Sequence, residues 1–80
     1  MHRETLRLSE AKVGKVYEIV RLIGGGFIKR RIMQMGLLPG VRIRVVRVAP
    51  LGDPIEINVK GYDLSIRRSE ARCVIVKVIG

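Results

Sequence analysis

Few side chains in this sequence could do chemistry, and those few are scattered. The 80 residues include one histidine, one cysteine and seven carboxylates. His2 stands at the amino terminus and Cys73 lies in an apolar run far from it. This spacing supplies neither a nucleophile with a neighbouring base nor the four ligands of a structural zinc site. We therefore expect no enzyme, and we interpret Cys73 as a small apolar side chain in the core. A metal-responsive module that uses Cys73 or His2 is kept as a further alternative.

Two further patterns favour structural over chemical roles. The glycines at residues 24–26 could form an anion-binding nest before a helix, but they lack the spacing of a nucleotide-phosphate loop. We interpret them as a bend. Met33 and Met35 are two residues apart, so they cannot share one face of a helix. We expect Met35 in the core and Met33 partly exposed.

The charge is strongly positive. Sixteen Lys and Arg residues against seven Asp and Glu residues give a formal net charge of +9. Such a balance is typical of proteins that meet nucleic acid, an anionic membrane face or an acidic protein surface. Arg42, Arg44 and Arg47 keep a nucleic-acid-binding small barrel open as the alternative. It is disfavoured because the chain has only three aromatic residues, and we expect Phe27 and Tyr62 in the core.

The sequence also bears on location. No apolar stretch approaches the ~20 residues of a membrane-spanning helix. The amino terminus lacks the apolar core of a signal peptide, and one cysteine cannot form an internal disulfide. These features indicate a cytoplasmic protein, which could include one bound at the inner face of the cell membrane.

Alternating apolar and polar residues predict several short strands and one helix. A bulge near Val45 and Val46 would keep the arginines of its strand on the solvent face, and Glu56 would pair with an outward Arg next to it. Ser9 is expected to cap a short turn, and residues 69–72 to form a capped turn. The predicted helix spans 27–35, with Ile28, Ile32 and Met35 on one face, and the predicted strands are 15–23, 41–48, 55–60, 62–67 and 73–79.

These elements indicate one domain over residues 1–80. It is mainly β with one inserted helix. Five short strands with glycine-marked bends favour a small five-stranded SH3-like barrel, closed or nearly closed, over an open sheet. An OB-type barrel is the second choice, because it usually carries its helix between later strands.

The chain resembles a known family in two segments. Residues 31–40 read RIMQMGLLPG and residues 49–55 read APLGDPI, and further likeness runs through most of the chain. In this pattern it is similar to the FeoA family of ferrous iron uptake. The resemblance implies an SH3-like barrel that acts with FeoB, a membrane transporter with a cytosolic GTP-binding domain. It also implies an association with transition metals, mainly through that pathway. We expect no required cofactor and at most a weak or indirect association with ferrous iron.

A domain without catalytic groups is expected to work by protein–protein interaction. Apolar side chains ringed by arginine are typical of interface hot spots. We predict one such surface on the helix and its following loop and a second at the turn of residues 50–53. A homodimer, through an exposed strand edge or the apolar loop, remains open. The predicted partner-binding residues are Lys29, Arg30, Met33, Leu37, Leu38, Leu51 and Asp53.

Overall fold

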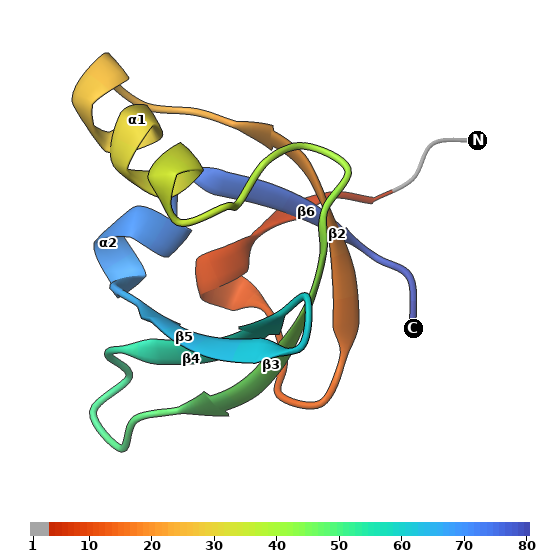
Figure 1. Cartoon of the computed structure of the whole chain (residues 1–80). Coiled ribbons are helices and arrows are strands. Elements are labelled where there is room, and N and C mark those ends of the chain that lie inside the picture. Colours follow the sequence, from red (N-terminus) through yellow and green to blue (C-terminus); the bar gives the residue numbers. More distant parts are fainter. Residues whose placement is uncertain (1–3) are drawn as a thin grey trace.

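Six antiparallel strands curl around the core in a computed structural model that describes residues 4–80 (Figure 1). Their order in the sheet is β1-β6-β2-β3-β4-β5. The main helix follows β2, and a short helix precedes β6. The bounds are β1 Leu6–Arg7, the 3-10 helix η1 Leu8–Glu10, β2 Val16–Leu22, α1 Gly26–Gln34, β3 Arg42–Val48, β4 Ile55–Val59, β5 Tyr62–Ile66, α2 Arg68–Ala71 and β6 Val74–Val78.

The mainly β class with one inserted helix is confirmed, whereas the strand count and the closed barrel are wrong. The sheet has six strands, and within residues 4–80 it is open, with β1 and β5 as its two edges. The additional strand is β1, which pairs with β6 through Leu6 and Arg7. Two residues are too few to show an alternating pattern, so only the pairing reveals this strand.

Bulges bend the sheet at two places. In β3 the register passes from Val45 opposite Ile57 to Arg47 opposite Glu56, which confirms the predicted bulge. The Arg47 Nε donates a hydrogen bond to the Glu56 carboxylate at 3.0 Å, as expected for that pair. A second register shift in β2, between residues 19 and 21, was not predicted because β-branched side chains run through that strand. An extra residue in one strand increases its local twist, which helps this sheet to curl.

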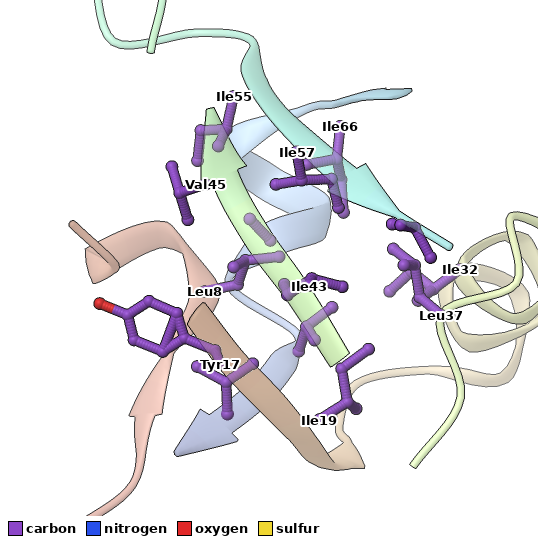
Figure 2. Close-up of a cluster of buried hydrophobic side chains, with 14 residues drawn as sticks. Leu8, Tyr17, Ile19, Ile32, Leu37, Ile43, Val45, Ile55, Ile57 and Ile66 are labelled. Carbon is purple, nitrogen blue, oxygen red and sulfur yellow. The ribbon is translucent and has the colours of Figure 1, made fainter. Parts of the chain in front are cut away.

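The core is built from the inner face of the sheet and one face of α1 (Figure 2). Ile32 is fully buried, as predicted, and Ile28 and Met35 are partly buried around it. The chain ends α1 at Gly36, which adopts a φ of +88°. The fully buried side chains are Leu8, Ile19, Ile32, Leu37, Ile43, Ile55, Ile57, Ile66, Val45, Val59, Val74 and Val76.

Three side chains expected in the core lie elsewhere. Phe27 is 78% exposed, because it stands in the first turn of α1, on a different side of the helix from Ile32. Tyr62 is 50% exposed at the start of the edge strand β5, where its hydroxyl donates a hydrogen bond to the carbonyl of Met35 at 3.4 Å. Cys73 is partly buried rather than enclosed, since it precedes β6 instead of belonging to it.

The turn around Ser9 also differs from the prediction. Ser9 lies inside η1 and is buried, and the residue at the start of this turn is Arg7. Glu10 accepts a hydrogen bond from the Arg7 amide at 3.4 Å, so a carboxylate rather than the serine hydroxyl serves the turn.

The capped turn predicted at residues 69–72 is present as α2, and its cap is Glu70. One carboxylate oxygen of Glu70 accepts a hydrogen bond from the Arg67 amide at 3.0 Å. The other accepts one from the Arg31 Nε of α1, also at 3.0 Å. The Glu70 side chain is only 7% exposed, so these two donors satisfy a charge that burial would otherwise penalise. Glu70 thereby joins α2 to α1.

Arg68 joins α2 to two other segments. Its amide donates to an Asp53 carboxylate oxygen at 3.0 Å, and its Nε donates to the Gly52 carbonyl at 2.8 Å. Its Nη1 donates to the Ser9 carbonyl at 2.9 Å. A single side chain therefore connects the loop of residues 49–54 and the segment η1, which lie far apart in the sequence.

Replacing Arg68 by methionine should destabilise the fold. The Arg68→Met variant keeps much of the aliphatic stem but leaves the carbonyls of Ser9 and Gly52 without their charged donor. We expect the free energy of unfolding to fall by about 2 kcal/mol, measured by urea denaturation. The matched Arg72→Met variant changes an exposed arginine at the end of α2 and should cost less than about 0.5 kcal/mol. Equal losses in the two variants would contradict the linking role of Arg68.

Candidate protein-interaction surface

The predicted interface residues on α1 occupy one flank of the helix. Lys29 and Met33 are four residues apart, which places them on the same face of α1 on successive turns. Met33 is 45% exposed, Arg30 is exposed and Lys29 is partly buried. Leu38, in the loop after the helix, is also exposed. These four residues therefore lie at the surface, as the sequence predicted.

Leu37 does not belong to that surface. It is fully buried in the core beside Ile32 (Figure 2). The left-handed conformation of Gly36 turns the chain back, and the Leu37 amide then donates to the Ile32 carbonyl at 3.3 Å. That return directs the Leu37 side chain inward. Leu37 was predicted as an interface residue, and the structure corrects this to a core residue.

The loop of residues 49–54 presents a leucine to the surface. Leu51 is 97% exposed at the tip of the loop. The Gly52 amide donates to the Ala49 carbonyl at 2.7 Å, and the Ala49 amide donates to the Pro54 carbonyl at 3.1 Å. Because Arg68 also binds this loop, the leucine is held outward by a fixed backbone. Asp53 anchors the loop through its bond to the Arg68 amide.

An open cleft of about 310 Å³ lies between α1 and α2, and the sequence analysis missed it. Phe27 and Ile28 give it an apolar wall, while Arg31 and Arg67 supply cations. Phe27 was assigned to the core, and the contact between Arg31 and Glu70 joins residues 39 positions apart, which no local pattern reveals. The lining residues are Phe27, Ile28, Arg31, Arg67, Ser69 and Glu70.

The helices α1 and α2, which border the cleft, and the loop of residues 49–54 lie at the left in Figure 1, and Arg68 bonds α2 to that loop. We call this surface the helical face and define it by Phe27, Arg31, Arg67 and Leu51. The Arg31 side chain remains 53% exposed although it pairs with Glu70. The helical face can therefore hold an apolar side chain against Phe27 while its arginines bind a nearby carboxylate.

Five carboxylates accept hydrogen bonds within the fold, namely Glu10, Asp53, Glu56, Asp63 and Glu70. Across residues 4–80 there is no group of three or more His, Cys, Asp or Glu side chains that could hold a metal ion. His2 lies outside the described residues. Over the same range no helix has both the length and the apolar character needed to cross a membrane.

The edge strand β5 bears on the open question of a homodimer. Its outer edge has no strand partner within the described part of the chain. Dimerisation through such an edge stays a prediction.

A comparison with curated proteins finds a relative that is much longer than this chain. It is the Fe(2+) transport protein A/Fe(2+) transporter FeoB fusion protein of Porphyromonas gingivalis, 40% identical over 74 residues. The match covers 92% of this chain and 9% of that protein. This chain therefore spans less than a tenth of the length of that relative.

Solved structures with the same fold cover the chain almost completely. The FeoA-like protein of Clostridium acetobutylicum, determined by NMR, is 32% identical with a TM-score of 0.90, covering 100% of this chain and 92% of that one. The FeoA of Stenotrophomonas maltophilia, an SH3 domain protein crystallised with zinc, is 27% identical with a TM-score of 0.75, covering 89% and 88% of the two chains. This likeness confirms the predicted SH3-like fold.

The family comparison agrees with the curated relative and with the solved structures. The model of the FeoA domain matches residues 6–78, from the first residue of β1 to the last residue of β6. The matched range includes both helices and every strand of the sheet. This chain belongs to the FeoA domain family.

Proposed function

We propose that this chain is a non-enzymatic accessory protein of ferrous iron transport that binds a FeoB-like membrane transporter, including its GTP-binding domain. The observation that supports this most directly is the relative of Porphyromonas gingivalis, named as a fusion of transport protein A with the FeoB transporter. Joining two modules in one chain raises the effective concentration of each for the other. A fusion is therefore what selection would favour for two domains that work in contact. The proposed location is the cytoplasm, at the inner face of the cell membrane.

The helical face is the surface we propose for the transporter. Among residues 4–80, Phe27 and Leu51 are the two most exposed of the large apolar side chains, at 78% and 97%. Exposed apolar groups next to arginine supply the anchors and the charge contacts that dominate binding energy at interfaces. The flank with Lys29, Arg30 and Met33, together with Leu38, extends this proposed surface along α1 and its loop.

The excess of positive charge suits an acidic partner. Arg31 and Arg67 border the cleft beside Phe27, and the whole chain carries +9. Charges at the rim of an interface chiefly accelerate association and select the partner. We therefore propose an acidic patch on the transporter that carries an apolar anchor for the cleft.

The binding test uses this chain and the purified cytosolic GTP-binding domain of the FeoB-like transporter from the same organism. We expect saturable binding by calorimetric titration. Replacing Phe27 or Leu51 by serine should weaken it by about tenfold or more, the size expected for loss of an interface anchor. The matched control is Val78→Ser, because Val78 is 51% exposed at the end of β6.

Two results would overturn this proposal. One is the absence of binding in the presence of GDP, GTP analogues and ferrous iron alike. The other is equal weakening by Phe27→Ser, Leu51→Ser and the control, which would move the contact away from the helical face.

We further propose that the chain needs no cofactor and that its association with transition metals arises through the transporter. Support comes from the carboxylates, since Glu70 and Glu56 are bonded to arginine side chains and Asp53 accepts from the Arg68 backbone amide. Anaerobic calorimetric titration with ferrous iron, and separately with zinc, should give no saturable heat. Stoichiometric binding that disappears in Cys73→Ser or His2→Ala would show instead a resident metal site.

A further inference from the structure

Cations gather on the side of the sheet that points away from the core. Arg42 and Arg44 alternate along β3 with the buried side chains of Ile43 and Val45, so they face outward. Arg44 lies opposite Asn58 of β4. Lys60 is exposed and directly follows Val59 of β4, which lies opposite Ile43. The pairing of β3 with β4 thus brings together charges that are distant in the sequence.

These three cations surround one open hollow of about 230 Å³, whose other lining includes Val16 and Asn58. We call Arg42, Arg44 and Lys60 the basic sheet face. Among residues 4–80, the ion pairs are Arg31 with Glu70 and Arg47 with Glu56, and neither involves this face. Glu18 lies opposite Arg42 on β2, and Asp63 accepts a hydrogen bond from Asn58 at 2.8 Å, yet among residues 4–80 neither carboxylate forms an ion pair with these cations. Lys77 lies opposite Glu18, so positive charges outnumber negative ones on this side of the sheet, and the excess attracts an anion.

We propose that the basic sheet face docks on the anionic phospholipid headgroups of a membrane surface. Guanidinium groups match the oxygen geometry of a phosphate, and each cation near an anionic bilayer adds to its attraction. The hollow is shallow and open, which suits headgroups presented by a flat surface. This inference depends on a surface different from the helical face, so it does not rest on the proposed transporter contact.

Aliphatic side chains beside these cations point to lipid. Val46, the bulged residue of β3, is 39% exposed just beyond Arg44. Val13 is 57% exposed in the preceding loop, which the Gly14 amide holds against β3 by a 2.8 Å bond to the Val45 carbonyl. Exposed aliphatic groups next to cations fit the boundary between headgroups and acyl chains.

Nucleic acid fits the same face less well, although it would also supply phosphates. Proteins that hold single strands stack the bases on aromatic side chains. Tyr17 is buried, whereas Phe27 belongs to the helical face and Tyr62 reaches toward the end of α1. Reading a duplex requires a helix or a two-stranded ribbon that enters a groove. The basic sheet face instead lies on β3 and β4, which have neighbouring strands on both sides.

The test is co-sedimentation of the full chain with vesicles. One set contains phosphatidylcholine alone, and the other contains about 30% phosphatidylglycerol. We expect binding only to the anionic vesicles at about 50 mM salt, with strong loss at about 500 mM, because salt screens exposed charges. The triple variant Arg42→Gln, Arg44→Gln, Lys60→Gln should bind about 100-fold more weakly, at roughly fivefold for each cation.

A matched triple variant separates a local site from net charge. Lys29→Gln, Arg30→Gln, Arg72→Gln removes the same charge from the helices and should retain most of the binding. Thermal unfolding of both variants checks that each is folded. The double variant Val13→Ser, Val46→Ser keeps the charge of the chain. It should still bind the anionic vesicles more weakly than the unchanged chain at the same salt concentration.

Three outcomes would overturn the inference. The first is no binding to anionic vesicles at low salt. The second is equal loss in the two triple variants, which would indicate attraction by net charge alone. The third is tighter binding to a short single-stranded RNA or a DNA duplex, lost in the Arg42, Arg44 and Lys60 variant, which would assign the face to nucleic acid.

Discussion

The placement of α2 against the 49–54 loop and η1 depends on the contacts of Arg68. A domain of this size has little core to spare, and α2 has only four residues, too few to be stable without outside support. Arg68 supplies that support by bonding the carbonyls of Ser9 and Gly52, while Glu70 bonds α2 to Arg31 of α1. Arg68 and Glu70 are two residues apart on α2, so their side chains leave the helix on different sides and reach different segments. Together they fix α1, the Leu51 loop and η1 relative to each other.

This arrangement explains why a strongly basic chain still buries a carboxylate. Glu70 is almost fully enclosed, and both of its oxygens have donors. Replacing one donor would leave a buried charge partly unsatisfied, which costs more than the contact itself contributes. Glu70 is thus enclosed by the fold, Glu56 and Asp53 make contacts nearer the surface, and most cations remain exposed. The positive charge is therefore a property of the surface that partners meet.

The sequence predicted what local patterns can determine. Alternation located the strands, and the slip from Val45 to Arg47 located a bulge and its outward arginine. The helix and its buried Ile32 followed from spacing alone. The SH3-like fold followed from the order of these elements and from the family resemblance. What escaped prediction depends on distant pairing, since β1 is two residues long and is visible only through its contact with β6.

The candidate surface was less predictable for the same reason. Leu37 and Leu38 are adjacent leucines in one loop, yet one is fully buried and the other is 43% exposed. The difference comes from the backbone turn at Gly36. That turn brings the Leu37 amide to the Ile32 carbonyl, so Leu37 points into the core beside Ile32. Phe27 looked like a core residue because aromatic side chains are usually buried, and only the placement of α1 over the end of the sheet leaves it exposed.

The positions of the two proposed surfaces have a joint consequence. The helical face lies on the α1 side of the core, and the basic sheet face points away from that core, because Arg42 and Arg44 alternate with inward residues. The Cα atoms of the domain extend over only 36 × 30 × 23 Å. A domain docked on headgroups by its sheet would therefore keep Phe27, on the α1 side, directed away from the bilayer and within these dimensions of it. The docked chain could then reach a transporter domain beside the membrane without leaving the lipid surface. Confinement near the membrane would raise the effective concentration of this chain for its partner, as covalent fusion does.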